Sequence, residues 1–408
     1  GKETSKLLSL HSLRLRIIGE NYRVAWVNVN YRMDIYTIIC MIFFFFLYQS
    51  SITMYYWKRN ENGFVIEVVM SDTITIYDIA KVVGSSPATI SKALNGRHDV
   101  SDALREKIIE TAASMGYRPN VHARGLKMKK SWLVGMVYGE DESDSLEHPL
   151  FLPIMNAFKR QMEHFGYELL FLSQHSKFIG DSLLSHAFSR QVDGLLLMNV
   201  AEHATRPFVA ASNGIPMVAC DAIVPTLSSV ITDNIMASKE AVRYLYGLGH
   251  RKIGHIAGPA NPVTVGGDER LEGFIQGMHG LGLLDADHNV VRAEGWTPNH
   301  GRDAFIELME KHPDITAIYC AADFYMMGML QVCRDKGIRI PADISVIGFD
   351  DVQWTAFVEP GFTTFRQNKE QLGTVAANRL LAAMDGEQST EIVRIPAELV
   401  IRGSCRKV

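Results

Sequence analysis

From residue 131 onward, short apolar runs alternate with longer amphipathic segments. The apolar runs have the length of buried strands, and the amphipathic segments repeat their apolar positions at helical spacing. This alternation predicts parallel sheets with helices on both faces, and two such series in succession predict two Rossmann-like lobes with a ligand cleft at the carboxyl ends of the strands. The expected strands are Trp132–Tyr138, Glu168–Leu172, Gly194–Met198, Met217–Cys220, Ile253–Ala257, Ala317–Cys320 and Ile344–Gly348, and the expected helices are Pro153–Phe165, Asn234–Gly247, Asp268–His279, Pro298–Glu310 and Asp323–Lys336.

Ahead of this body, the stretch from Thr75 carries two helix starts around a tight turn. Thr75 and Asp78 form a pattern similar to a capping box, and apolar residues follow at helical spacing. Gly84 ends this helix, and Ser86 with Pro87 starts a second one that runs to Leu94. A third helix, Ser101 to Ala113, would close a three-helix core, so the stretch predicts a helix-turn-helix unit.

These residues resemble the DNA-binding head of the lactose-repressor (LacI/GalR) family of bacterial transcription regulators. The chain departs from the family pattern at Val83, at Ser85, which removes an apolar turn residue, and at Lys92, where Arg is usual. The alternative is a generic three-helix domain. The matching positions are Thr75, Asp78, Ile79, Ala80, Gly84, Ser86, Thr89, Ser91, Leu94 and Asn95.

The resemblance implies which side chains of the head meet DNA. Pro87, Ala88 and Lys92 fall where the family reads base edges, and Lys92 alone among them donates hydrogen bonds. Thr89 and Ser91 fall where the family meets phosphate. The residues of the head expected to bind DNA are Thr75, Ser86, Pro87, Ala88, Thr89, Ser91, Lys92 and Asn95.

The segment after the head resembles the family's hinge, with Asn120, Ala123, Leu126 and Lys129 as further DNA contacts. A helix of about eight residues is unstable alone in water, so we expect it to form only when two copies pack on DNA. The resemblance implies that Leu126 is wedged into a minor-groove step and bends the duplex. The alternative is that Leu126 is an ordinary linker residue.

The resemblance continues through the body, in segments such as Val192–Leu195, Arg270–Phe274 and Asp343–Asp351. It implies a two-lobed core like that of type I periplasmic binding proteins, crossed by the chain near residues 232, 366 and 394. The domains expected are an N-terminal extension at 1–72, a helix-turn-helix domain at 73–118, a hinge at 119–131 and the effector-binding and dimerisation domain at 132–408.

Several polar and aromatic residues fall where the family holds its effector. Sugar hydroxyls need charged or bidentate partners, and the C–H face of a sugar needs an aromatic plate. Arg270 and Asp350 suit the first role, unless they form a salt pair that bridges the lobes. Trp296 suits the second; the alternative for Trp296 and for Trp354 is that they are core residues. The expected effector-binding residues are His148, Phe151, Asp221, Arg270, Trp296, Asp323, Asp350 and Trp354. Ala322 replaces a family Asn and leaves the identity of the sugar open.

Charge is divided unevenly along the chain. Residues 73–130 carry a net charge of +5 and residues 131–408 carry −11, within a total of −4. A basic head on an acidic body is consistent with a DNA contact confined to the head. The five scattered cysteines lack a C-x-x-C pair and indicate a reducing, cytoplasmic setting without a disulfide framework or zinc site. No catalytic motif is found, so the sequence predicts no enzyme, cofactor or metal.

The first 69 residues contain an apolar run, Tyr36 to Leu47, with four consecutive Phe. Its core is short for a membrane span, which needs about twenty residues. Three interpretations compete: a membrane anchor, an extra packing element, and an upstream stretch ahead of a true start at Met70. We favour the third.

Together these patterns predict a DNA-binding regulator, expected to repress, that binds a pseudo-palindromic operator in double-stranded DNA as a homodimer without contacting a membrane. A small-molecule effector, expected to be a carbohydrate, would bind between the lobes and control operator affinity. The alternative is a membrane-tethered or exported sugar-binding protein without DNA function.

Replacing the predicted wedge, Leu126→Ala, should weaken specific operator binding far more than non-specific binding, because only the bent operator complex uses the wedge. Filter binding at fixed salt on operator and random duplexes measures both. Equal losses on the two duplexes would show that Leu126 is only a linker residue.

Overall fold

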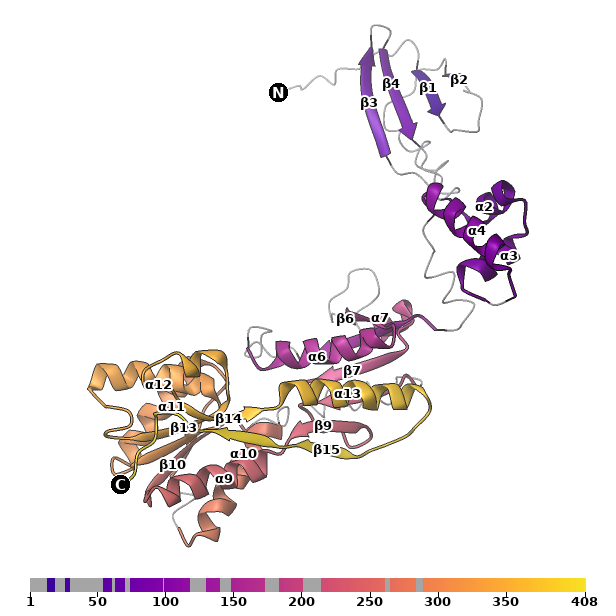
Figure 1. Cartoon of the computed structure of the whole chain (residues 1–408). Helices are drawn as coiled ribbons and strands as arrows, with labels where there is room; N and C mark the ends of the chain where they lie inside the picture. Colours follow the sequence, from indigo (N-terminus) through magenta and orange to yellow (C-terminus); the bar gives the residue numbers. More distant parts are fainter. Residues whose placement is uncertain are drawn as a thin grey trace, which may run out of the picture. The chain divides into compact units, whose positions relative to one another are not determined.

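The structure, a computed structural model, describes residues 13–18, 26–29, 54–60, 63–69, 74–97, 99–117, 130–139, 148–172, 183–200, 214–260, 265–283 and 289–408 (Figure 1). The chain divides into two compact units, residues 1–120 and residues 121–408. The predicted hinge contacts Asn120, Ala123, Leu126 and Lys129 lie outside the described residues.

The head consists of helices α2 (Ile76–Val83), α3 (Pro87–Leu94) and α4 (Asp102–Ser114), as predicted. Ile79, Ile90 and Ile108, one from each helix, are fully buried and form its core. Gly84 ends α2 in the left-handed conformation, with φ of 74°, which glycine adopts without steric cost. The Ser86 hydroxyl then accepts a hydrogen bond from the Thr89 amide at 3.1 Å, and this cap starts α3.

Four strands precede the head and form one sheet in the order β2-β1-β4-β3. They are β1 (Leu13–Ile18), β2 (Trp26–Val29), β3 (Met54–Asn60) and β4 (Gly63–Val69). These strands were not predicted from the sequence, and the apolar run Tyr36 to Leu47 lies outside the described residues.

The first lobe of the body is built on a six-stranded, all-parallel sheet in the order β15-β9-β8-β7-β5-β6. Helices α6 and α13 pack together over one of its faces, and Ala187 of α7 belongs to the core on the other face (Figure 1). The elements are β5 (Leu133–Tyr138), α6 (Phe151–His164), β6 (Glu168–Phe171), α7 (Leu183–Arg190), β7 (Gly194–Met198), β8 (Met217–Cys220), β9 (Ser228–Thr232), α13 (Lys369–Met384) and β15 (Ile392–Ile395).

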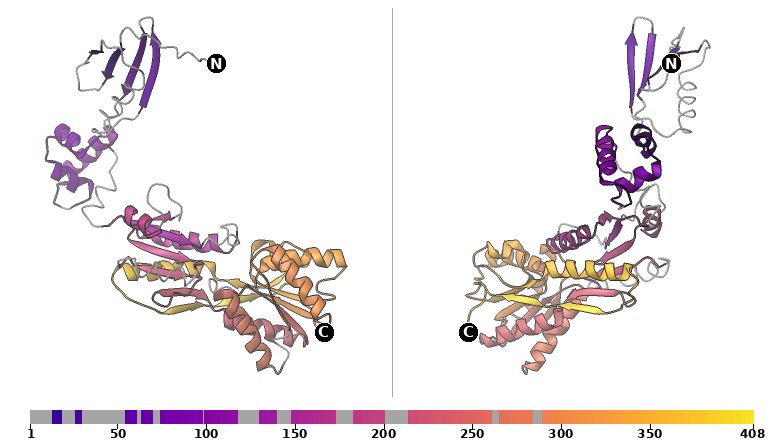
Figure 2. Two further views of the ribbon diagram at one scale, coloured as in Figure 1. Left: turned by 180° about the vertical axis from the view of Figure 1, so that it is seen from behind. Right: turned by 45° about the vertical axis from the view of Figure 1, so that its right-hand side comes forward.

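The second lobe has a six-stranded sheet in the order β11-β10-β12-β13-β14-β16, parallel except for its last pair. Helices α11 and α12 pair over one face and α9 and α10 over the other, which Figure 2 shows from two further sides. The elements are α9 (Asn234–Gly247), β10 (Ile253–Ala257), α10 (Val265–Gly280), β11 (Val290–Arg292), α11 (Pro298–Lys311), β12 (Ala317–Cys320), α12 (Asp323–Lys336), β13 (Ser345–Asp350), the short 3-10 helix η1 (Gln353–Ala356), β14 (Thr363–Gln367) and β16 (Ala397–Val400).

Each sheet has one hydrophobic core on each of its two faces. Successive side chains of a central strand pack into opposite cores, because side chains alternate between the faces of a strand. In β7, Leu196 packs under α6 and α13, while its neighbour Leu195 packs on the opposite face. In β12, Ile318 and Tyr319 divide in the same way between the two cores of the second lobe. Burial on both faces explains why these strands read as continuous apolar runs in the sequence.

The chain passes between the lobes three times, and we call these segments the crossovers. They join β9 to α9 at 232–234, β14 to α13 at 367–369 and β15 to β16 at 395–397. The predicted crossings near 232, 366 and 394 are therefore confirmed. The elements of the body that are not predicted from the sequence are β9, β11, β14, β15, β16, α7 and α13.

His255 occupies the middle of the second lobe as part of an aromatic stack. Its ring stacks against both Phe274 and Tyr319, at centroid distances of 4.8 and 4.7 Å, and its Nδ1 forms a hydrogen bond with the Tyr319 carbonyl at 2.8 Å. Nε2 is buried without a hydrogen-bond partner among the described residues. Burial lowers the pKa of His255 to about 3.

This low pKa predicts that the body loses stability in mild acid. The unfolded chain takes up a proton at His255 below its ordinary pKa of about 6.5, while the folded chain does not, so stability falls as the pH drops from 7 toward 3. At pH 5 the loss from this residue is about 2 kcal/mol. Urea unfolding at pH 7 and pH 5 should show a smaller loss in His255→Phe, which keeps the stack. An identical pH dependence in both proteins would contradict this role of His255.

Candidate effector pocket and DNA-reading face

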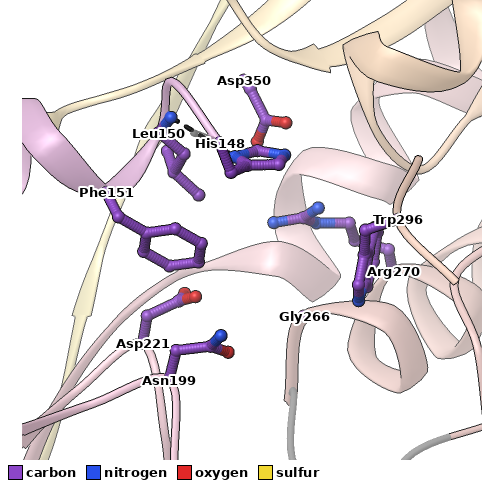
Figure 3. Close-up of a pocket in the computed structure, with 9 residues that line it drawn as sticks. All are labelled: His148, Leu150, Phe151, Asn199, Asp221, Gly266, Arg270, Trp296 and Asp350. Atoms are coloured by element: carbon purple, nitrogen blue, oxygen red, sulfur yellow. Dashed lines mark hydrogen bonds between the residues drawn. The ribbon is translucent and has the colours of Figure 1, made fainter. Parts of the chain in front are cut away.

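A cavity with about 390 Å³ of empty space, partly open to solvent, lies at the edge where the strands of both lobes end. Figure 3 shows Phe151 on one side of it and Arg270 with Trp296 on the opposite side, while Asp221 and Asn199 point into the space between them. The lining residues are His148, Leu150, Phe151, Asn199, Asp221, Gly266, Arg270, Trp296 and Asp350.

Three of the lining residues share one position in the fold, at the carboxyl end of a parallel strand. Asn199 follows β7 with φ of 50°, Asp221 follows β8 with φ of 53°, and Asp350 ends β13 with φ of 116°. Asn and Asp tolerate positive φ better than other residues that carry side chains. Each strand therefore ends in a turn that presents an amide or carboxylate at the cleft.

Arg270 brings a positive charge to the pocket from α10. Its Nε donates to the Asn234 side chain at 2.9 Å, one terminal nitrogen donates to the Ala321 carbonyl at 2.7 Å, and the guanidinium lies 3.8 Å above the Phe349 ring. The residue is only 4% exposed. These contacts fix the guanidinium, which points toward the middle of the cavity in Figure 3 and leaves its second terminal nitrogen to donate there.

Asp350 supplies a negative charge, and hydrogen bonds fix its position as they fix that of Arg270. One of its carboxylate oxygens accepts a hydrogen bond from the Gln367 amide at 2.6 Å, and its backbone carbonyl accepts one from the Lys369 ammonium. Asp350 is 1% exposed. Because one carboxylate oxygen is engaged, the other is the acceptor that remains for a bound molecule.

Aromatic rings from both lobes surround these charges. Trp296 stacks on Tyr325 with a centroid distance of 5.7 Å and an interplanar angle of 4°. A Cβ atom on Gly258 would lie only 2.4 Å from the Trp296 ring, so the glycine makes room for it. On the other side, His148 of the first lobe packs on Phe324 of α12 at 4.6 Å, a direct contact across the cleft.

Six of the eight predicted effector-binding residues line the cavity: His148, Phe151, Asp221, Arg270, Trp296 and Asp350. The predicted alternative for Arg270 and Asp350, a salt pair bridging the lobes, is wrong, because both belong to the second lobe and no ion pair joins them among the described contacts. Of the three lining residues outside the predicted set, Asn199 carried the clearest signal, since it follows an apolar strand as Asp221 does.

Asp323 does not line the cavity, contrary to expectation. It is fully buried, and its carboxylate accepts hydrogen bonds from the Val352 amide at 2.9 Å and the Thr364 hydroxyl at 2.7 Å. Burial, together with the nearby Asp350 carboxylate, raises the pKa of Asp323 well above its usual range. Its geometry is that of a support for the loop after β13, so the prediction of direct effector contact needs correction.

Trp354 is also absent from the cavity lining. It packs against the core under α11 and α12, edge-on to the Phe362 ring, with a centroid distance of 5.8 Å and an interplanar angle of 71°. For this residue the core interpretation is the one that the structure supports.

The outer face of α3 is the candidate DNA-reading face. Ser86, Ala88, Lys92 and Asn95 are exposed, and Pro87, Thr89 and Ser91 are half-buried, whereas Ile90 and Ala93 point into the core. Thr75 is exposed at the start of α2. The eight predicted contacts of the head are therefore accessible.

The Lys92 ammonium forms a salt bridge of 2.5 Å with Asp99, in the loop between α3 and α4. The hydrogen bond from Lys92 lowers the pKa of Asp99. Sequence analysis did not identify this pair. It neutralises the one hydrogen-bonding side chain among the three expected base readers.

Comparison with known proteins agrees with this architecture. The family model described as "Bacterial regulatory proteins, lacI family" matches residues 75–120, and the model "Periplasmic binding protein-like domain" matches residues 242–405. The HTH-type transcriptional repressor CytR of Escherichia coli is 31% identical over 340 residues, which cover 81% of this chain and 96% of CytR. The chain belongs to the lacI family of bacterial regulatory proteins.

As a lacI-family member, the chain is a DNA-binding transcriptional regulator, and its fold matches solved relatives. The lac repressor dimer bound to operator and the anti-inducer ONPF superposes with a TM-score of 0.73 at 25% identity, covering 82% of this chain and 100% of that one. The CelR–cellobiose complex superposes with a TM-score of 0.61 at 27% identity, covering 81% and 99%. These matches confirm the predicted helix-turn-helix head and two-lobed core.

In the part of the chain that the structure describes, no helix is both long and apolar enough to cross a membrane, and no cluster of side chains is suited to hold a metal ion.

Removing the charge that faces Lys92, in Asp99→Asn, should increase non-specific DNA affinity several-fold and steepen its salt dependence by about one phosphate contact, because the freed ammonium neutralises one more phosphate. Fluorescence anisotropy with a random duplex at several salt concentrations measures both. Asp102→Asn is the matched control, since it removes an equal charge from the start of α4, where Asp102 pairs with Arg105. An equal change of DNA affinity in the control would show that the effect comes from net charge alone and not from the Lys92–Asp99 pair.

Proposed function

We propose that this regulator represses transcription as a homodimer on a pseudo-palindromic operator, and that a small neutral effector bound between the lobes sets its operator affinity. We propose a sugar as the effector. The residues assigned to DNA are the head and hinge contacts named above, and those assigned to the effector are the six predicted residues that line the cavity.

One observation carries the proposal for the effector: a fixed donor, Arg270, and a fixed acceptor, Asp350, share a cavity with aromatic plates. Adjacent hydroxyls of a sugar present both a donor and an acceptor, so they match this pair, and the C–H face of the ring packs on Trp296 or Phe151. Most of the polar groups are immobilised before binding, which reduces the entropy lost when a ligand binds. The solved relative CelR binds cellobiose in its complex, which supports the same class of ligand.

The charged residues of the cavity narrow the class of ligand that it can bind. Asp221 and Asp350 supply two carboxylates, while Arg270 supplies one guanidinium. A phosphorylated ligand would place negative charge beside both carboxylates in a partly desolvated site, which is unfavourable. The proposed effector is therefore a free sugar and not a sugar phosphate.

A nucleoside is the second candidate, favoured by one specific feature. Phe151 and Trp296 face the cavity from opposite sides (Figure 3), and two aromatic rings suit a flat base as well as a sugar ring. The ribose hydroxyls of a nucleoside would then meet Arg270 and Asp350.

The domain boundaries follow from this function. We propose that residues 73–118 read DNA, residues 119–131 form the hinge, residues 132–408 bind the effector and dimerise, and residues 1–72 are an extension. Binding chromosomal DNA places the working protein in the cytoplasm. The helix-turn-helix match supports this proposal over an exported sugar-binding protein.

Replacing the fixed donor, Arg270→Ala, should weaken effector binding by roughly tenfold to a hundredfold, because a charged hydrogen bond contributes about 1.5–3 kcal/mol. Calorimetric titration with D-glucose, cellobiose, uridine and glucose 6-phosphate tests the parent and the variant. We expect a neutral probe to bind the parent and glucose 6-phosphate to bind least.

Arg334→Ala is the control for this experiment, because Arg334 is a largely exposed arginine of the same lobe on α12. If a folded Arg270→Ala variant binds the probes with unchanged affinity, Arg270 is not an effector-binding residue. Tightest binding of glucose 6-phosphate would overturn the charge argument.

A further inference from the structure

The crossovers contain buried polar side chains, which is unusual for segments that only connect two lobes. Thr232 and Asn234 lie at the first crossover and Gln367 at the second, and each is 1% exposed. Polar groups at this burial are stable only when they are hydrogen-bonded. Their partners therefore indicate what the crossovers are attached to.

Gln367 attaches two crossovers to the pocket. Its amide nitrogen donates to the Asp350 carboxylate at 2.6 Å, and its amide oxygen accepts a hydrogen bond from the Thr232 hydroxyl. Lys369, two residues further on, donates to the backbone carbonyls of Asp350 and Asp351. One buried amide thus joins the acidic group of the pocket to both the first and the second crossover.

Asn234 makes the corresponding connection for the basic group of the pocket. Its side-chain oxygen accepts from Arg270 at 2.9 Å, and its nitrogen donates to the Thr232 carbonyl at 3.0 Å and to Glu269 at 3.1 Å. Glu269 in turn forms a two-fold salt bridge with Arg394, at 3.0 and 2.7 Å. Arg394 belongs to β15, directly before the third crossover.

We propose that Gln367 is the positioning residue that couples the effector pocket to the crossovers, and that the hydrogen-bond network of Thr232, Asn234, Glu269, Gln367 and Arg394 carries this coupling. The part of the proposal that concerns an effector rests on the proposed function. The part that concerns Asp350 and the crossovers rests on the contacts alone.

The physical reason is that the network has few ways to remain satisfied. A rotation of one lobe on the other must change the backbone of the crossovers, and a buried amide cannot exchange a lost partner for water. A bound molecule that donates to the second carboxylate oxygen of Asp350 fixes that side chain, and it therefore favours the arrangement of the crossovers in which Gln367 keeps its contact. Coupling between sites requires such a differential contact.

The first experiment is a double-mutant cycle without any effector, with operator affinity as the readout. Asp350→Asn and Gln367→Met are made singly and together in the full chain. If the two residues act through one contact, each single variant changes operator affinity about threefold or more, and the double variant stays within roughly twofold of Gln367→Met alone. Additive effects would overturn the proposal.

The second experiment compares operator affinity with and without D-glucose, cellobiose or uridine, using whichever of these probes binds the parent. The effect of the probe is the ratio of the larger to the smaller of these two operator affinities. Gln367→Met should lower this ratio about tenfold or more, which is the size of a typical coupling between sites. An unchanged ratio overturns the effector part. If no probe binds the parent, the proposed function fails, while the double-mutant cycle still decides the contact between Asp350 and the crossovers.

Ser404→Ala is the matched control, because it removes buried hydrogen bonds of the same lobe, to the Val346 carbonyl at 2.6 Å and from the Thr363 amide at 2.8 Å, near the ends of β13 and β14 opposite to Asp350 and Gln367. Melting temperatures separate a loss of stability from a loss of coupling, and the control should leave the ratio unchanged. Should Gln367→Met fail to fold, Thr232→Val removes the far end of the same connection with little change of shape, and the same cycle is measured with it.

Discussion

The parallel arrangement of the strands is the constraint on which the site depends. Parallel strands all end at one edge of a sheet, so residues far apart in the sequence are brought together there. In the first lobe this edge receives Asn199 and Asp221, and in the second lobe it receives Asp350. Each of these residues has positive φ, so the strand ends abruptly and its polar side chain lies at the cleft.

Charge burial decides which of the acidic residues are available to a ligand. Asp351 keeps a lowered pKa although burial raises it, because Arg402 and Arg366 donate hydrogen bonds to its carboxylate. Asp323 has no such cation among the residues that the structure describes, so burial and the nearby Asp350 carboxylate raise its pKa although two neutral groups donate hydrogen bonds to it. Asp350 and Asp221 face the cavity instead. Two adjacent carboxylates at one strand end therefore have different surroundings: Asp351 holds the C-terminal segment through Arg402, and Asp350 lines the cavity.

The head follows a different principle, since its core forms from residues close in sequence. Ile79, Ile90 and Ile108 meet because each of three short helices presents one apolar face, and caps and a glycine turn set the angle between the first two. What remains exposed on α3 is the candidate DNA-reading face. The pairing of Lys92 with Asp99 adds an electrostatic control on that surface, made between the helix and the loop that follows it.

Much of this protein could be predicted from sequence because the relevant signals are local. Capping residues, the Pro87 helix start and strand-length apolar runs predicted the head and the two lobes, whereas the three crossings were implied by the family resemblance. Strands β15 and β16 escaped prediction because they lie at sheet edges and mix polar with apolar residues without a clear period, and β14, although it lies inside its sheet, is built mostly of polar residues. Only tertiary structure decided that Asp323 is a buried support, that Trp354 is core, and that Gln367 reaches Asp350. The physical reason is that each of these outcomes depends on a partner from a distant segment, which local spacing does not encode.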